Sequence, residues 1–428
     1  MNAIAPSRIV LILLLTFFTG SGPLQATELE QGRPESVDVS SNRLALIDQL
    51  AERYVAEGKY SGIVTMVARK GKVIHLHAAG NYGVDNEKPM APDTLFRIYS
   101  MTKPVTAIAA MILYEEGKFH VNDPVSKYLP EFAEQKILID GELRAPKSPM
   151  TIRQLMTHTA GLSYGWTQDN PVDVQYAEAK LFEAANLKEF VAKLAELPLR
   201  FEPGTRYHYS VSFDVLGALI ERVGGMPLDE FFQKRIFDPL NMEDTFFEVP
   251  ADKLDRLASD QGWDYENSKI AVVPAEQSRN FTDVNLFVGG GGLVSTIGDY
   301  MRFSQMVLNG GSLDGVRVLG PKTVQFLSAN HLTDKVRAEG VGQYPALDLY
   351  AGQSMAFAYG VVTNPDLMPD MSSRGELSWG GVAGTKFWID PEEELIGIAM
   401  VQLYQAPWQL RSDLKTATYQ ALTELYGD

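Results

Sequence analysis

The sequence has no cysteine among its 428 residues. Disulfide bonds and a lipid-modified cysteine near the N-terminus are therefore excluded, and the fold must be held together by its core. Histidine is scarce, with six in all, and no His-Glu-x-x-His motif or other metal-ligand spacing is present. We expect an activity that needs neither a metal nor another cofactor.

Clusters of basic residues are also absent. Lysine and arginine total 38 against 54 aspartates and glutamates, which gives a net charge of −16. Because binding to a phosphate backbone requires a basic face, nucleic acid is not an expected partner. A chain of this length can bury a large core, as one elaborate domain or as two intertwined ones. The sequence does not indicate an oligomeric state.

Apolar runs long enough to span a bilayer are missing too. The apolar run at residues 9–18 follows Arg8 and is succeeded by small residues up to Ala26. This pattern predicts a secretory signal peptide over residues 1–26, cleaved near Ala26. We therefore expect an exported protein, periplasmic or secreted, without a stable membrane anchor.

The rest of the chain alternates between strand-like and helix-like patterns. The patterns predict an α+β fold, in which helices flank an antiparallel sheet and a mostly helical domain is inserted. The sheet domain takes residues 41–98 and 283–428, the helical domain takes 99–282, and the active site lies between them. Strands are expected at residues 63–67, 73–77, 357–362, 384–389 and 395–401, and helices at 44–58, 151–158, 177–197, 299–308 and 412–426. Another helix is expected to run through residues 216–223 and to stop at the glycines 224–225.

Ser100 and Lys103 stand three residues apart where a buried helix is expected to begin, just before Pro104. One helical turn places both side chains on the same face. A serine hydroxyl becomes a useful nucleophile when a base takes its proton, and a lysine can be that base where burial keeps it neutral. The free N–H groups at the start of the helix also suit an oxyanion. The pair is therefore a candidate nucleophile and base.

Three other patterns compete with this interpretation. Ser412 and Lys415 repeat the spacing, in a segment that indicates an exposed helix start. Ser163 lies in a Gly-x-Ser-x-Gly motif like that of α/β-hydrolases, but the strand that this motif needs does not precede it, so we interpret Ser163 as a turn residue near the mouth of the site. Residues 289–292 are glycines, which we interpret as close backbone packing because no Gly-Lys-Ser/Thr follows them.

Three short motifs follow one another along the chain, namely Ser100-Met-Thr-Lys103, Tyr209-Ser-Val211 and Trp379-Gly-Gly381. Together with the stretches at residues 155–162 and 384–391, they resemble the motifs of the serine β-lactamase and penicillin-binding-protein superfamily. The resemblance is strongest to its carboxylesterase branch, the family VIII esterases, which are similar to class C β-lactamases. It covers the chain from about residue 44 to the end and implies a β-lactamase/transpeptidase-like fold.

The resemblance implies a role for each catalytic position. Ser100 would be the acylated nucleophile, and Lys103 would be the group that takes its proton. Tyr209 would assist, either as a phenolate or through a proton that it shares with Lys103. The backbone N–H groups of Ser100 and Val382 would form the oxyanion hole.

The third motif, at Trp379, Gly380 and Gly381, would bind substrate, and here the sequence departs from β-lactamases. Those enzymes usually carry a lysine and a hydroxyl residue at its first two positions, which help to hold the β-lactam carboxylate. Val211 also replaces their asparagine. These changes favour a neutral short-chain acyl ester as the small-molecule substrate, with weak β-lactam hydrolysis as a side activity. The alternatives are a β-lactamase or D-alanyl-D-alanine carboxypeptidase, and a non-enzymatic binding protein on the same fold.

Overall fold

The computed structural model describes residues 29–167, 170–340 and 349–427. The predicted signal peptide lies outside these residues, so its cleavage and the export of the chain stay predictions. Across the described residues, no helix combines the length and the hydropathy that crossing a bilayer requires.

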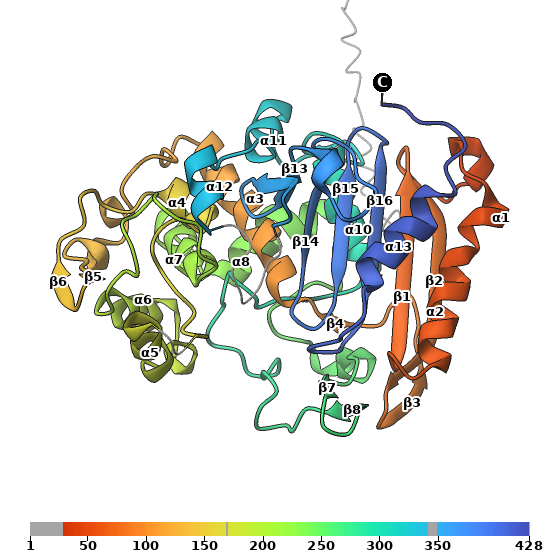
Figure 1. The fold of residues 1–428 in the computed structure, drawn as a ribbon, viewed down its shortest axis with the longest axis horizontal. Coiled ribbons are helices and arrows are strands. Elements are labelled where there is room, and N and C mark those ends of the chain that lie inside the picture. The colour runs from red at the N-terminus through yellow and green to blue at the C-terminus, as the bar shows by residue number, and fades with distance from the viewer. Residues whose placement is uncertain (1–28, 168–169, 341–348, 428) are drawn as a thin grey trace, which may run out of the picture.

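An antiparallel sheet forms the right-hand part of the molecule (Figure 1). In the part of the chain that the structure describes, the sheet has eight strands in the order β12-β13-β14-β15-β16-β1-β2-β3. All of them come from the two segments in which the sequence predicted strands, so the α+β class is confirmed. The strands are β1 (Gly62–Arg69), β2 (Lys72–Gly83), β3 (Asn86–Pro89), β12 (Gln353–Met355), β13 (Gly360–Val362), β14 (Leu377–Gly380), β15 (Lys386–Asp390) and β16 (Leu395–Met400).

The sheet joins the two ends of the chain in one hydrogen-bonded layer. β1 pairs with β16, with Val64 opposite Met400, and it also pairs in an antiparallel hairpin with β2. Because a slip of one residue would turn every side chain to the wrong face, two buried faces hold this register. The pairing thereby places β14, which carries the third motif, relative to the chain that leads to Ser100.

Helices cover both faces of the sheet. α2 and α13 enclose Trp388 on one face, and on the other the Tyr300 ring of α10 lies 5.0 Å from the Phe387 ring, centroid to centroid. Because adjacent strand residues point to opposite faces, Phe387 and Trp388 belong to separate hydrophobic clusters. The bounds are α2 (Leu46–Ala56), α10 (Ile297–Leu308) and α13 (Leu410–Tyr419).

α3 (Thr102–Glu115) is the buried helix that the sequence predicted after Ser100, and nearly all of its side chains are buried. It lies between the sheet and the helical part on the left of Figure 1. Just ahead of it, β4 (Phe96–Arg97) pairs with β9 (Val294–Ser295). This short pair holds the chain before Ser100 beside the glycine run at 289–292.

The centre of the chain is mostly helical, as predicted, but the helix expected at residues 177–197 is two helices. Lys180 has a left-handed φ of 48°, and Asn186 begins a new helix by accepting a hydrogen bond from the N–H of Glu189 at 3.0 Å. The apolar spacing continues across this break, which is why the pattern did not predict it. The helices here are α4 (Ile152–Met156), α5 (Pro171–Glu178), α6 (Leu187–Ala195), α7 (Ser212–Gly224), α8 (Leu228–Phe232) and α9 (Asp238–Leu240).

The other elements are short connections around these two parts. They are α1 (Ser41–Leu44), α11 (Pro321–Leu327), α12 (Asp334–Gly340), and the two-stranded pairs β5 (Ile137–Ile139) with β6 (Glu142–Arg144), β7 (Gln261–Asp264) with β8 (Lys269–Val272) and β10 (Ser312–Leu313) with β11 (Val316–Arg317).

The predicted exposed start of the last helix, at Ser412 and Lys415, is wrong. Lys415 is fully buried in α13, and its Nζ donates to both carboxylate oxygens of Glu376, at 2.9 and 2.8 Å. Ser412 binds Asp370 instead of the lysine. Buried charges need such partners, so this Ser-x-x-Lys pair is part of an ionic contact that fastens α13 to the chain entering β14.

Candidate active site

Ser100 lies in a single 3₁₀ turn, Tyr99–Met101, directly ahead of α3. Tyr99 has a left-handed φ of 43°, a conformation that costs energy for a bulky residue, and its hydroxyl is hydrogen-bonded to that of Tyr404. The turn leaves Ser100 partly exposed. Lys103 is fully buried one turn along, and its Nζ lies 3.1 Å from Ser100 Oγ.

Tyr209 reaches the same atom from the irregular chain before α7. Its hydroxyl donates to Ser100 Oγ at 2.6 Å, although the two residues are 109 positions apart. Its ring packs on that of His158, 4.5 Å away between centroids. The structure therefore brings the three predicted catalytic side chains together at Ser100 Oγ, with only the serine open to solvent.

The glycine run packs behind Lys103. Lys103 Nζ donates to Gly290 O at 2.6 Å, and the Gly290 N–H donates to Asp214 Oδ1 at 2.9 Å. A Cβ on Gly289 would lie 2.5 Å from Phe213 O, and one on Gly290 would lie 2.7 Å from Asp214 Oδ2. The predicted close backbone packing of these glycines is therefore confirmed.

Burial controls the protonation of this cluster. It lowers the pKa of Lys103 to about 7, although the carboxyl of Asp214 opposes the change. Burial also raises the pKa of Asp214 to about 6. Since the two groups titrate together, their protons belong to the pair. Near neutral pH the cluster can hold Lys103 as an uncharged amine, which is the form a general base requires.

The aromatic and histidine side chains around Lys103 stay neutral. Burial raises the pKa of Tyr209, against the hydrogen bond with Ser100, which lowers it. Burial also lowers the pKa of His158 well below its usual value, and His158 Nδ1 accepts the N–H of Ser210 at 3.3 Å. These pKa shifts favour a neutral Tyr209 that shares its proton with Lys103, rather than a Tyr209 that is deprotonated at rest. The sequence motifs give no role to His158 or Asp214.

The third motif closes the site from the sheet. A Cβ on Gly381 would lie 2.6 Å from Ile98 O, so only glycine lets the end of β14 approach the turn of Ser100 this closely. Trp379 is 5% exposed, with its ring 6.1 Å from that of Tyr209, centroid to centroid. Among the turn and loop hydrogen bonds of the described residues, the N–H groups of Ser100 and Val382 donate to no carbonyl, which leaves both free for an oxyanion.

Gly380 makes room for a lysine from the next strand. Lys386 of β15 lies opposite Gly380 in the ladder, and a Cβ on Gly380 would lie 2.6 Å from Lys386 Nζ. Because side chains alternate between the faces of a sheet, Lys386 lies on the face opposite Trp379. It therefore does not restore a cation at the first position of the third motif.

Ser163 lies in irregular chain rather than in a turn, and it is 1% exposed and makes internal contacts. Its Oγ donates to Asp173 Oδ1 at 2.6 Å and lies 3.2 Å from His208 Nε2. Asp173 also pairs with Arg200. A catalytic triad needs the carboxylate on the histidine and an accessible serine, so this arrangement is that of a buried polar contact.

Aromatic side chains that the sequence analysis did not assign line one side of the site. The rings of Tyr164 and Trp166 stack, with centroids 4.3 Å apart and planes at 5°, and Phe182 lies against Tyr164. Tyr164 is 5.3 Å from Tyr209 between centroids, and Trp166 is 48% exposed. This aromatic wall, formed by Tyr164, Trp166 and Phe182, offers an apolar surface beside Ser100.

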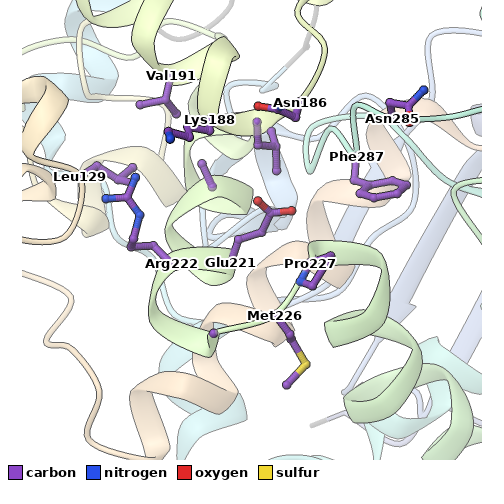
Figure 2. Close-up of a pocket in the computed structure, with 13 residues that line it drawn as sticks. Leu129, Asn186, Lys188, Val191, Glu221, Arg222, Met226, Pro227, Asn285 and Phe287 are labelled. Atoms are coloured by element: carbon purple, nitrogen blue, oxygen red, sulfur yellow. The ribbon is translucent and has the colours of Figure 1, made fainter.

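A separate cavity of about 520 Å³ lies between α6 and α7. Figure 2 shows Lys188 and Glu221 on opposite sides of it, with Phe287 at one end. Ser100 and its partners do not line this cavity. Among the described residues, no group of three or more His, Cys, Asp or Glu side chains is placed to hold a metal ion.

Comparison with known proteins gives concordant matches over most of the chain. The model of the family described as Beta-lactamase matches residues 47–420. Protein Rv1367c of Mycobacterium tuberculosis is 35% identical over 353 residues, which cover 81% of this chain and 86% of that protein. Esterase EstB of Burkholderia gladioli is 29% identical, and the match covers 87% of this chain and 93% of that protein. The structure of EstCE1, a hydrolase with promiscuous acyltransferase activity, superposes with a TM-score of 0.75 at 26% identity. The superposition covers 88% of this chain and 99% of EstCE1.

Proposed function

Because this chain belongs to the beta-lactamase family, we propose that it is a serine esterase that hydrolyses short-chain acyl esters through an acyl-enzyme on Ser100. Its similarity to Esterase EstB and to EstCE1 supports hydrolase activity on this fold. The observation that carries the proposal is the convergence on Ser100 Oγ, with Lys103 Nζ at 3.1 Å and the Tyr209 hydroxyl at 2.6 Å.

Acylation begins when neutral Lys103 takes the proton of Ser100. Oγ then attacks the ester carbonyl carbon, and the carbonyl oxygen becomes an oxyanion that accepts the N–H groups of Ser100 and Val382. As the tetrahedral intermediate collapses, the carbon–oxygen bond to the alcohol breaks. The alcohol leaves with the proton that Lys103 had taken, which passes through the Tyr209 hydroxyl.

Deacylation repeats these steps with water in place of the serine. A water molecule replaces the departed alcohol and gives its proton to the Lys103 and Tyr209 pair as it attacks the acyl carbon. The bond to Ser100 Oγ breaks, the acid leaves, and the serine recovers its proton. An alcohol that enters in place of water would give acyl transfer by the same steps.

A substrate comparison tests this function against its main alternative. We expect kcat/KM for p-nitrophenyl butyrate to exceed that for the cephalosporin nitrocefin, because Trp379 and Gly380 replace the groups that hold a β-lactam carboxylate. Steady-state rates of the purified protein on both compounds measure the ratio. A higher kcat/KM for nitrocefin would instead favour a β-lactamase, and turnover of neither would favour a binding protein.

The rate should depend on pH through the Lys103 and Asp214 pair. Below about pH 7 Lys103 is protonated and cannot accept a proton, so kcat/KM should fall about tenfold per pH unit on the acid side and level off above it. Tyr209 sets no alkaline limit in this range, because burial raises its pKa. Initial rates on p-nitrophenyl butyrate across the neutral range give the profile, and a rate independent of pH there would exclude Lys103 as the base.

We also propose that residues 1–26 direct export of the chain and are removed near Ala26. The support is the sequence pattern alone. N-terminal sequencing of the protein recovered outside the cytoplasm would test it.

A further inference from the structure

Arg279 lies beside the catalytic cluster although it belongs to none of the motifs. It comes from the segment between β8 and β9, which passes below the sheet and the helical part in Figure 1. Its Nη1 donates to Gly291 O at 2.8 Å. The preceding carbonyl, that of Gly290, accepts the Nζ of Lys103 at 2.6 Å. Two basic side chains, Lys103 and Arg279, therefore bind successive carbonyls of one turn.

The surroundings of Arg279 are those of the nucleophile. A Cβ on Gly291 would lie 3.7 Å from the backbone of Tyr99, the residue before Ser100. The phenol groups of Tyr99, Tyr404 and Tyr164 all interact electrostatically with Arg279. Tyr164 belongs to the aromatic wall of the site. Arg279 thus lies within the cluster of polar and aromatic groups that surrounds Ser100.

Most of the hydrogen-bonding capacity of Arg279 is unused within the described residues. A guanidinium has five N–H donors, and the hydrogen bond to Gly291 is the one assigned here. The carboxyl of Asp214 interacts electrostatically with Arg279, but no carboxylate of the described residues lies within the 4.0 Å of an ion pair with it. The Phe281 ring, 5.4 Å from the guanidinium carbon, packs against it. Since Arg279 is partly exposed, its remaining donors are open to a ligand.

We propose that Arg279 binds a carboxylate on the substrate, so that the preferred substrate is an ester that carries a free carboxylate away from the scissile bond. A guanidinium edge matches a carboxylate through two parallel hydrogen bonds. The third motif has lost the lysine that serves β-lactamases in this way, and Arg279 supplies a cation from a different direction. The inference rests on the proposed esterase function, and it differs from the expectation of a neutral ester.

Matched pairs of esters test this specificity. In one pair the carboxylate is on the alcohol part of the ester, as in 3-carboxyphenyl butyrate, and 3-carbamoylphenyl butyrate is the neutral counterpart. In the other it is on the acid, as in mono-p-nitrophenyl adipate and p-nitrophenyl adipamate. For one of the pairs we expect the wild type to prefer the carboxylate by tenfold to a hundredfold in kcat/KM, about the strength of a charge-assisted contact. The pair that shows the preference tells which side of the ester faces Arg279.

The variant Arg279→Gln should reduce that ratio to near one, chiefly through a higher KM for the carboxylate ester, while Arg279→Lys should keep part of it. Arg144→Gln is the control, because it removes the same charge from the exposed strand β6, and it should keep the wild-type ratio. A wild type without a preference in either pair would overturn the proposal. An Arg279→Gln variant that slows both esters equally would also overturn it, because that result would mean that Arg279 only stabilises the turn at Gly291. Failure of the wild type to hydrolyse any of the four esters would refute the esterase function itself.

Discussion

Replacing Ser100 by alanine is expected to lower kcat/KM for p-nitrophenyl butyrate by about 10⁴-fold or more, because the acyl-enzyme cannot form without its oxygen. The loss should appear in kcat. The fold should be little affected, since Ser100 is partly exposed and Lys103 keeps its hydrogen bond to Gly290 O. Initial rates and thermal unfolding of the purified variant measure the two effects.

Ser163→Ala is the matched control for that variant. Ser163 is buried and bonded to Asp173, so its loss should lower the free energy of unfolding by about 1–3 kcal/mol. The folded fraction should nevertheless keep a kcat close to that of the wild type. If Ser163→Ala abolished turnover while Ser100→Ala retained it, the assignment of the nucleophile would be wrong.

Lys103→Met should lower kcat by about 10²–10⁴-fold, the usual contribution of a general base. Methionine has a similar length and suits a site that is fully buried, so the change removes the amine with little loss of packing. It should also abolish the acid limb of the pH profile, because the group that titrates near pH 7 is gone. Rates across the neutral range measure both effects.

The second buried lysine provides the control for the first. Lys415 also follows a serine by three residues, is fully buried, and is held by Glu376 and Asp370. Lys415→Met should lower the free energy of unfolding by about 3–5 kcal/mol, because it removes the nearest cation from two buried carboxylates, yet kcat of the folded enzyme should change little. Equal losses of kcat in the two variants would remove the special role of Lys103.

Strong periodic patterns made much of the fold predictable. The strand β1 and the helix α3 are long and apolar, and the Thr296 side chain caps α10 by accepting the Asp299 N–H. β14 was not predicted as a strand, because four residues that end in glycine carry no period of their own. It forms since β13 and β15 pair with it on either side.

Motif order singled out Ser100, Lys103 and Tyr209, which the structure brings together, while the groups around them had no such signal. Asp214 and Arg279 reach the site through long-range contacts with Gly290 and Gly291, and a single sequence carries no local signal of such contacts. For Lys415 the local sequence pattern gave a signal, but the signal was misleading. Its spacing resembled the start of an exposed helix, and its burial depends on Glu376, which lies 39 positions away.

The most direct measurement of the central claim is to locate the atom that becomes acylated. The protein would be treated with a fluorophosphonate, which reacts with activated serines, and then digested and mapped by mass spectrometry. The account predicts one adduct per chain, on the peptide that contains Ser100, with loss of esterase activity in proportion. An adduct on Ser163, or continued hydrolysis of esters with Ser100 fully modified, would contradict it.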